Sequence, residues 1–283
     1  MPSLADVGEA GLLAELARRG LASGIDGDVA ALGGGLVVTQ DALVEDVHFR
    51  LAWTSFRDLG YKAAAVNLSD LAAAGAEPEA LIVTLGAPAT TSLEAVVELY
   101  EGIAEVGVPV RGGDTTAADK LVLSITALGR SDRVPGRGGA QPGDYLVVTG
   151  PLGGSAAGLR ALESGFSSPL VAAHLRPPIR LAEGRELART AHALMDISDG
   201  LAADLPRLAA ASGVCCAVDL DLVPRFDGVD TEEAARGGED YELLAALAEP
   251  GEWHVIGRCV EGEGVDYGHH YRDVRLRGFE HFR

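Results

Sequence analysis

Apolar residues recur at helical spacing in several stretches of the chain. Residues 6–19 carry leucines and alanines on one stripe that stops at Gly20, which predicts a packing helix. Residues 57–75 are rich in alanine with one apolar stripe, which predicts a long helix that contains Asp70 near its end. The same reasoning predicts further helices over residues 92–107, 153–165, 177–191 and 199–213.

Short apolar or β-branched runs, bounded by Gly, Pro and Asp, alternate with these helices. They predict strands over residues 36–41, 80–88, 108–116, 120–130, 144–150, 214–220, 241–247 and 253–260. Such alternation is typical of an α/β protein with mixed sheets. The segment 131–144 concentrates Pro, Gly and Arg without apolar periodicity and predicts a boundary between two domains, 1–135 and 136–283.

Composition narrows the class of protein. The chain has 283 residues, 47% hydrophobic and 23% charged, which is enough for a sizeable core in two domains. Its formal net charge of -19 argues against a nucleic-acid surface, which needs clustered Lys and Arg. The three cysteines are an odd number with one adjacent pair, so we expect free thiols. Because no apolar run approaches the roughly 20 residues of a membrane span and no secretory signal is evident, we expect a cytoplasmic protein.

Aspartates gather at predicted strand ends and in turns flanked by glycine, where function concentrates. Each one alone is more often a turn residue or a helix cap, as Asp199 would be at the start of a helix. Their joint occurrence on an acidic chain favours a magnesium site, because Mg²⁺ prefers carboxylate oxygens and converging carboxylates repel one another without a cation. The candidate ligands are Asp28, Asp41, Asp70, Asp114, Asp196 and Asp199.

Phosphate binding is not signalled by a standard motif. The chain lacks GxxxxGK[ST] and has only two lysines, Lys62 and Lys120, so ATP would be held through metal ions. The glycines at 149–158 can offer backbone amides to a phosphate but more often form a plain turn. His48 can contact an anionic substrate or be structural, and Arg137 can bind a phosphate or do nothing specific. The residues alone indicate an acidic, magnesium-binding α/β enzyme that acts on something phosphorylated.

Seven segments resemble the thiamine-monophosphate kinase family in order and spacing. They are IDGDVAAL, TQDALVEDVHF, GYKAAAVNLSDLAAAGAEP, GGDTT, RGGAQPGDYLVVTG, MDISDGLAADL and GGEDYELL, and they cover most of the chain. The resemblance implies a two-domain fold like that of aminoimidazole ribonucleotide synthetase and a homodimer whose N-terminal sheets pair. It also implies that ATP and several magnesium ions bind in a cleft between that sheet and the second domain.

The resemblance also implies a role for each matching residue. The implied magnesium ligands are Asp28, Asp41, Asp70, Asp114 and Asp196, with Thr39 and Asp199 as further ligands and Gln40 through its backbone carbonyl. The implied nucleotide contacts are Tyr100, Gly113, Asp114, Arg137 and Ser198. The implied contacts to thiamine monophosphate are His48, Glu239 and Phe279, the last by stacking on a flat ring of the substrate.

The implied reaction is direct in-line transfer of the terminal phosphoryl group of ATP to the substrate phosphate, which gives thiamine diphosphate. Neither a covalent enzyme intermediate nor a strong general base is needed, because a phosphate monoester is already a nucleophile near neutral pH. Positioning and neutralisation of charge by magnesium would carry the catalysis.

The chain departs from the family pattern at three places. Gly27 stands before Asp28 where the family has two adjacent aspartates, and Gln40 replaces a hydroxyl residue. The stretches 224–237 and 260–272 are compressed. Two alternative functions therefore stay open: another ATP-dependent synthetase of the same superfamily, and a nucleotide-binding homologue with impaired catalysis.

Overall fold

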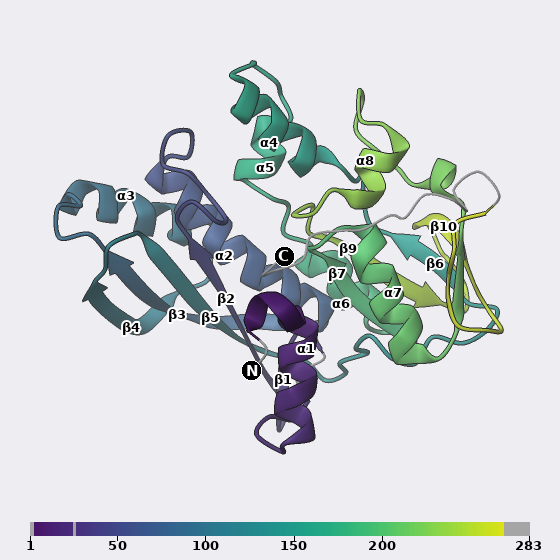
Figure 1. Cartoon of the computed structure of the whole chain (residues 1–283). Coiled ribbons are helices and arrows are strands. Elements are labelled where there is room, and N and C mark those ends of the chain that lie inside the picture. Colours follow the sequence, from purple (N-terminus) through teal and green to yellow (C-terminus); the bar gives the residue numbers. More distant parts are fainter. Residues whose placement is uncertain (1–2, 25–26, 269–283) are drawn as a thin grey trace.

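The computed structural model describes residues 3–24 and 27–268, which form two sheets with helices packed on them (Figure 1). This architecture confirms the predicted α/β class with mixed sheets. The elements of the N-terminal half are α1 (Leu4–Arg18), β1 (Ala30–Gly33), β2 (Leu36–Val44), α2 (Phe56–Ala73), β3 (Glu77–Ala87), α3 (Leu93–Ala104), β4 (Val110–Ala117) and β5 (Val122–Arg130). Its sheet has the order β1-β2-β5-β3-β4, in which β3 and β4 are parallel and the other neighbours antiparallel.

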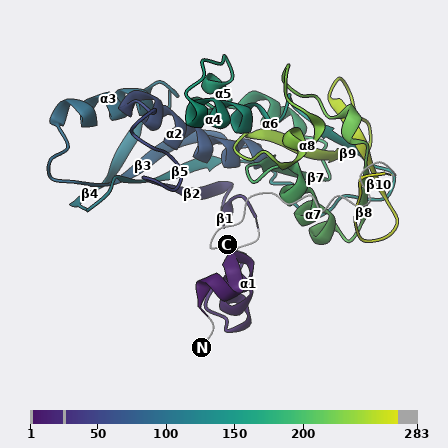
Figure 2. The ribbon, with the colours of Figure 1, turned by 45° about the horizontal axis from the view of Figure 1, so that its top comes forward.

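Helices α2 and α3 lie on the same side of this sheet, and among the described residues no helix covers most of its other face (Figure 2). In β5 the side chains that face the helices, Leu123, Ile125 and Ala127, are buried. Ser124 and Thr126 between them are only partly buried. This period of two marks a strand with one face on a core, and it leaves an open face on the opposite side of the sheet.

The C-terminal half has a sheet of six strands. Its elements are β6 (Tyr145–Val148), α4 (Gly154–Ser164), α5 (Val171–Leu175), α6 (Leu181–Leu187), β7 (Ala193–Ile197), α7 (Leu201–Ser212), β8 (Cys215–Val218), the short 3-10 helix η1 (Leu220–Leu222), α8 (Thr231–Arg236), β9 (Glu242–Leu247), β10 (His254–Val260) and β11 (Gly264–Asp266). The strand order is β11-β8-β10-β6-β9-β7, with β11 and β8 parallel and the other neighbours antiparallel.

Several parts of the C-terminal half differ from the sequence prediction, and the short elements α5 and β11 were among those not predicted. The helix predicted over 177–191 is shorter, because the prolines at its start stay outside α6 and the chain turns after Leu187 to enter β7. Strand β7 was not predicted, since all five of its residues are buried and no polar alternation marks it as a strand. Helix α8 was missed because six residues are too few to show a helical period.

Helix α2 belongs to the cores of both halves. Leu68 and Leu71 pack into the core of the N-terminal half, whereas Ala72 packs with Leu187 in a core that lies between the halves. Helices α2 and α6 approach so closely that a Cβ atom on Gly184 would lie 2.1 Å from the carbonyl oxygen of Ala72. Only glycine permits this contact, which fixes the two halves against each other.

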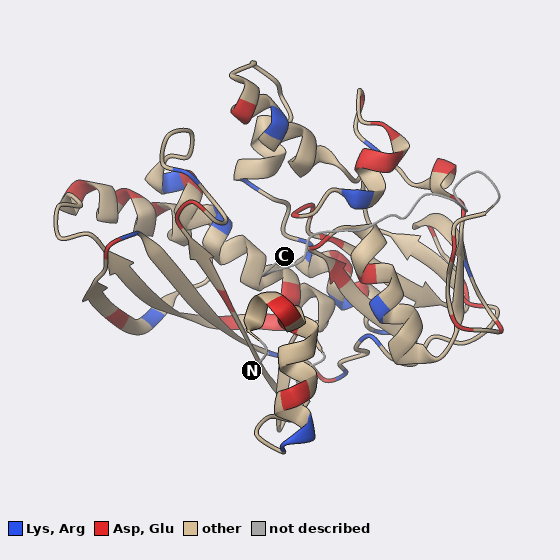
Figure 3. Ribbon diagram, in the orientation of Figure 1, with Lys and Arg blue, Asp and Glu red and all other residues tan. Residues whose placement is uncertain are grey.

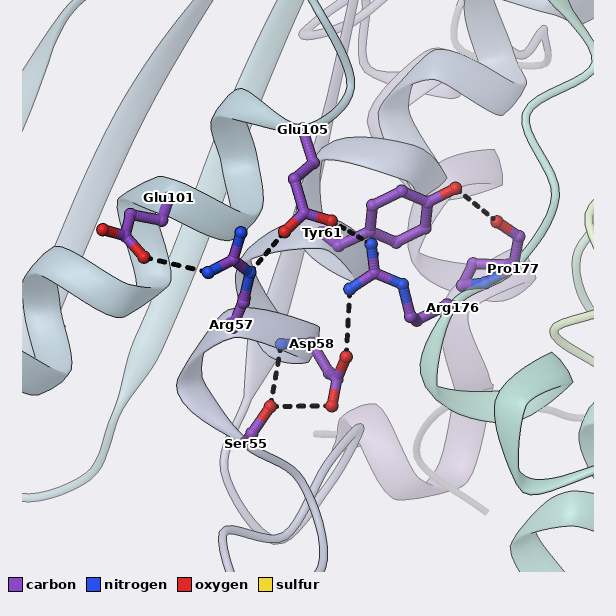
Figure 4. Close-up of polar contacts among 8 residues, drawn as sticks. All are labelled: Ser55, Arg57, Asp58, Tyr61, Glu101, Glu105, Arg176 and Pro177. Carbon is purple, nitrogen blue, oxygen red and sulfur yellow. Dashed lines mark hydrogen bonds and ion pairs between the residues drawn. The ribbon is translucent and has the colours of Figure 1, made fainter.

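A polar network joins the two halves at another point of α2 (Figure 4). Arg176, which follows α5, donates to Asp58 on α2 over 3.0 Å and also contacts Glu105 just after α3. Its guanidinium lies 4.1 Å from the centre of the Tyr61 ring, and Arg57 contacts Glu105 as well. Because these charged side chains are partly exposed to water, each pair contributes little to stability.

Helix α1 stands apart from both sheets in Figure 2. Within the described part of the chain, none of the helices combines the length and the apolar character that crossing a bilayer requires.

Candidate active site

A cavity of about 450 Å³ lies between the two halves. Its N-terminal wall comes from the end of β2, the loop that follows it, and α2. Its other wall comes from α4, α5 and the two loops that follow β7 and precede β9. Asp and Glu residues are spread along the ribbon of the described residues, and several stand where the halves meet (Figure 3). The predicted site residues that line the cavity are Asp41, His48, Asp70, Asp196, Ser198, Asp199 and Glu239.

Three predicted magnesium ligands meet beside this cavity. One carboxylate oxygen from each of Asp28, Asp70 and Asp196 lies within 4.8 Å of the other two. Asp28 precedes β1, Asp70 lies in the last turn of α2, and Asp196 lies on β7. Segments from both halves, far apart in the sequence, therefore build one carboxylate cluster.

The segment NLSD on α2 explains how the helix joins this cluster. Asn67 accepts the backbone N–H of Asp41 over 3.0 Å, which fixes the end of β2 against the helix. Ser69 donates its hydroxyl to Asp196 over 2.7 Å and so links the two halves. Asp70 itself supplies a carboxylate, so each polar residue of the segment has a separate contact.

The environment of the cluster disfavours its negative charge. Burial raises the pKa of Asp70 well above its ordinary value, and the carboxylates of Asp196, Asp41 and Asp28 raise it further. Burial also raises the pKa of Asp196 well above its ordinary value, with Asp28 as the next contribution. The hydroxyl of Thr39, which donates to Asp70 over 2.5 Å, offsets a part of this effect.

The donor atoms suit a hard divalent cation, because all of them are carboxylate oxygens, which Mg²⁺ prefers. Among the described residues, neither Asp70 nor Asp196 forms an ion pair with a lysine or arginine. A buried anion needs such a partner, and a metal ion would supply the charge. Asp28 differs, because Arg137 donates to it through Nε over 3.0 Å and through Nη2 as well. Arg137 thus lies beside the cluster, and its role as a phosphate contact stays a prediction.

Two loops that contain glycine bring Ser198 and Asp199 to the cavity. The backbone N–H of Glu239 donates to the carbonyl oxygen of Ser198 over 2.6 Å. Gly238 permits this approach, since a Cβ atom there would lie 2.8 Å from the same oxygen. Asp199 forms an ion pair with Arg207 over 2.7 Å. The segments MDISDG and GGEDY therefore act as one unit of the cavity wall.

Asp240 fixes the start of α4. Its carboxylate accepts the backbone N–H of Gly153 over 2.6 Å and that of Ser155 over 3.0 Å. Burial raises the pKa of Asp240 to about 7. Because these amides of the glycine segment 149–158 are already bonded inside the protein, the structure favours the interpretation of that segment as a turn.

His48 lies in the loop after β2. Its Nδ1 accepts the backbone N–H of Val44 over 3.0 Å, so a neutral ring carries its proton on Nε2. The same loop brings Phe49, Arg50 and Trp53 to the cavity wall. His48 therefore combines a local structural contact with a place in the site.

Three other predicted site residues lie away from this cavity. Gly113 and Asp114 are on the exposed edge strand β4, three strand positions from Asp41 on β2. This separation is about 14 Å at the usual strand spacing, so one chain alone does not bring Asp114 to the cluster. The side chain of Gln40 points to the open face of the sheet, where it donates to Ser124 over 2.9 Å, which leaves only its backbone carbonyl for the predicted role.

Tyr100 lies on α3 and packs against the core of the N-terminal half, and it is not part of the cavity wall. Phe279 lies outside the described residues. The roles predicted for these two aromatic residues stay predictions.

The sequence prediction missed Lys62, Asn67, Ser69 and His174 as residues of the site. The first three lie in the segment GYKAAAVNLSD, which was recognised only as a family motif. Their partners lie in other segments, and the pattern along the chain does not show which side chains will meet.

Comparisons with known proteins agree with this geometry. Family models for AIR synthase related proteins match residues 25–131 (N-terminal domain) and 141–269 (C-terminal domain). The thiamine-monophosphate kinase of Mycobacterium tuberculosis (strain H37Rv) is 36% identical and the match covers 92% of this chain and 87% of that protein. The thiamine-monophosphate kinase of Aquifex aeolicus (strain VF5) is 34% identical over 99% of both proteins.

Solved structures lead to the same group. AaThiL complexed with AMPPCP and TMP has a TM-score of 0.92 at 32% identity, and the match covers 99% of both chains. The hydrogenase maturation protein HypE has a TM-score of 0.67 at 22% identity over 82% of both chains, which shows a shared fold alone.

Proposed function

The chain belongs to the thiamine-monophosphate kinases of the AIR synthase related family, and from this premise we propose that it uses magnesium ions to transfer the terminal phosphoryl group of ATP to thiamine monophosphate. The observation that carries the proposal is the buried cluster of Asp28, Asp70 and Asp196 beside a cavity between the halves. Carboxylates and substrate phosphates together are the usual way in which proteins hold Mg²⁺.

In the proposed reaction an oxygen of the acceptor phosphate attacks the terminal phosphorus of ATP. The new P–O bond forms as the bond to ADP breaks, and the products are thiamine diphosphate and ADP. The three clustered aspartates, with Asp41 and Asp199 from the cavity wall, would hold magnesium. Bound Mg²⁺ screens the phosphates and stabilises the charge that develops on the transferred group.

The contribution of the chain itself is to hold two anionic substrates in one geometry. Arg137 lies beside the cluster, where its guanidinium can bind a phosphate. His48 and Glu239 line the cavity, and we assign them to the acceptor. This arrangement requires no covalent intermediate on the protein.

We further propose a homodimer that forms through the open face of the N-terminal sheet. This face carries the half-exposed apolar side chains of Val38, Ile82, Val122 and Leu128, a surface that a second copy of the sheet would cover. Asp114 lies on the same face, because it pairs with Thr84 next to the core residue Val83. Its role as a ligand therefore needs a site to which a second chain contributes.

The dimer is tested by light scattering on the purified protein. A lysine at position 122 (Val122→Lys) should give monomers, whereas Leu93→Lys, at an 80% exposed position on α3, should leave the dimer intact. A wild-type monomer, or a dimeric Val122→Lys variant, would rule out this interface.

We also keep two proposals made from the sequence: two domains, formed by residues 1–135 and 136–283, and a cytoplasmic location.

The function is tested by measuring ADP and thiamine diphosphate together, with ATP, magnesium and a series of acceptors. The acceptors are thiamine monophosphate, free thiamine, aminoimidazole-type precursors and none. Turnover confined to thiamine monophosphate, with equal amounts of both products, is the expected result. ADP formed with another acceptor would move the chain to a synthetase function, and nucleotide binding without turnover would indicate lost catalysis.

A further inference from the structure

Glu239, which we assign to the acceptor, belongs to a polar cluster whose other members have no role in the proposed reaction. Lys62 on α2 is only 1% exposed, and its Nζ lies 3.0 Å from Oε2 of Glu239. Nδ1 of His174 lies 3.3 Å from the same oxygen and 3.0 Å from the hydroxyl of Ser155. The cluster joins α2 of one half to α4, α5 and the loop before β9 of the other.

Lys62 contacts Glu239 from the side that faces away from the cavity. Glu239, His174 and Ser155 line the cavity, but Lys62 does not. The side chain of Glu239 is 27% exposed, whereas that of Lys62 is 2% exposed. The ammonium therefore reaches the carboxylate from inside the protein, and both recorded side-chain contacts use Oε2, so that Oε1 can face a ligand in the cavity.

The backbone of Glu239 has a conformation that is unusual for a residue with a side chain. Its φ angle is +64°, in the left-handed region that costs a residue with a side chain about 1 kcal/mol or more. The N–H of Glu239 is fixed on the carbonyl oxygen of Ser198 over 2.6 Å. Glycine adopts this conformation without strain. We infer that a glutamate stands here because its side chain has a role.

The charge states of His174, Lys62 and Glu239 decide whether the cluster can attract a cation. Burial, with Lys62 nearby as a second cause, lowers the pKa of His174 to about 4, so the ring is neutral near pH 7. His174 thus lies with Nδ1 against the Glu239 carboxylate, 3.3 Å from Oε2, and adds no charge. A cation in the cavity lies closer to the carboxylate than to the buried ammonium, and a net attraction remains.

We propose that Lys62 and His174 are positioning residues, which hold the Glu239 carboxylate against the cavity so that it binds the positively charged thiazolium ring of the acceptor. This inference rests on the proposed function, because it takes thiamine monophosphate as the acceptor. According to this inference, the protein selects the acceptor by the positive charge of the thiazolium ring. The phosphate of the acceptor is bound separately, at the proposed magnesium site.

The test measures dissociation constants by titration calorimetry for two ligands. One is thiamine monophosphate, and the other is its isostere with an uncharged thiophene in place of the thiazolium. The variants are Glu239→Gln and Lys62→Met, with Asp58→Asn as the control, because Asp58 joins α2 to the other half outside the cavity. The KM for ATP is measured alongside.

We expect the wild type to bind thiamine monophosphate about tenfold or more tightly than the isostere. Glu239→Gln and Lys62→Met should weaken only the binding of thiamine monophosphate, by a similar factor, and leave the KM for ATP within about twofold. Asp58→Asn should bind both ligands as the wild type does. If Lys62→Met does not fold, His174→Asn, which changes the other side chain against Oε2 of Glu239, gives the same comparison.

Equal losses for both ligands in the variants, a parallel rise in the KM for ATP, or no loss at all would overturn the inference. A wild type that binds thiamine monophosphate selectively but does not phosphorylate it would refute the proposed function and keep the inference. A wild type that phosphorylates thiamine monophosphate but binds both ligands equally would do the reverse.

Discussion

Asp196 on β7 and Glu242 on β9 lie on neighbouring strands, and both are almost fully buried. Glu242 accepts hydrogen bonds from Arg180 over 2.6 and 2.8 Å and from the hydroxyl of Thr149 over 2.6 Å. Asp196 accepts one from Ser69 over 2.7 Å, but within the described residues it forms no direct ion pair, and Arg137, which acts on it from farther away, is paired with Asp28. Two further carboxylates lie beside it instead.

The difference separates a structural carboxylate from a functional one. A buried charge costs several kcal/mol unless an opposite charge and hydrogen bonds compensate it. The chain itself compensates Glu242, so that residue belongs to the fold. Within the described residues Asp196 and Asp70 have no direct ion pair, and the nearby Arg137 is paired with Asp28, so we expect a bound metal ion to offset the remaining cost.

The largest effect that this comparison predicts is on activity. Asp70→Asn keeps the shape of the side chain but removes one charged ligand, and we expect phosphoryl transfer to fall at least about a thousandfold. Thermal unfolding in the presence of a chelator should show equal or higher stability, because one uncompensated charge is gone. Wild-type rates in this variant would remove Asp70 from the site.

The next effect is on stability. Arg180→Met leaves the Glu242 carboxylate buried without its cation, and we expect the free energy of unfolding to fall by about 3 kcal/mol, measured by urea titration. The double variant Arg180→Met/Glu242→Gln should recover most of this loss. A loss below about 1 kcal/mol in the single variant would mean that Glu242 is less dependent on Arg180 than its two hydrogen bonds indicate.

Magnesium should stabilise the wild type. At a concentration a hundred times the dissociation constant, we expect a gain of about 2.7 kcal/mol in the free energy of unfolding. Thermal unfolding with and without Mg²⁺ measures the gain, which should shrink in Asp70→Asn and persist in Glu242→Gln. A gain of the same size in Asp70→Asn would place the metal elsewhere.

The smallest effect concerns the network in Figure 4. Asp58→Asn removes one ion pair with Arg176, which keeps its contact to Glu105. The pair is partly exposed, and we expect the free energy of unfolding to change by less than about 1 kcal/mol in urea titration. A change comparable to that of Arg180→Met would show that exposure does not explain the contrast between the two kinds of carboxylate.

The sequence was sufficient for much of the fold and for the chemistry of the site. Helix α2 was predicted over 57–75 and is observed over Phe56–Ala73, because its apolar stripe and alanine content are local properties. Asp28, Asp70 and Asp196 were predicted to be ligands from their type and setting, and the structure brings their carboxylates together, although their role as ligands stays a prediction. Strand β7 escaped prediction because a strand that is buried on both faces has no alternating pattern.

The contacts of the site could not be predicted in the same way. Lys62 meets Glu239, which is 177 positions away in the sequence, and Ser69 meets Asp196, which is 127 positions away. Such pairs depend on how the two halves pack, and neither residue type nor local spacing encodes that packing. The opposite limit applies to Asp114, whose motif is clear but which lies on an edge strand away from the cluster, so its role as a ligand stays a prediction.

The contact of Gly184 with Ala72 has a mechanical consequence. Hinged enzymes admit and release substrates by rotating their domains apart, but here α2 is packed into the cores of both halves. A large rotation would expose those cores, so we expect the frame of the cleft to stay rigid through the catalytic cycle. Nucleotide and acceptor would then enter and leave by movement of the loop between β2 and α2, which places His48 and Trp53 at the cavity wall. We expect the rate at which this loop opens to set the upper limit on turnover.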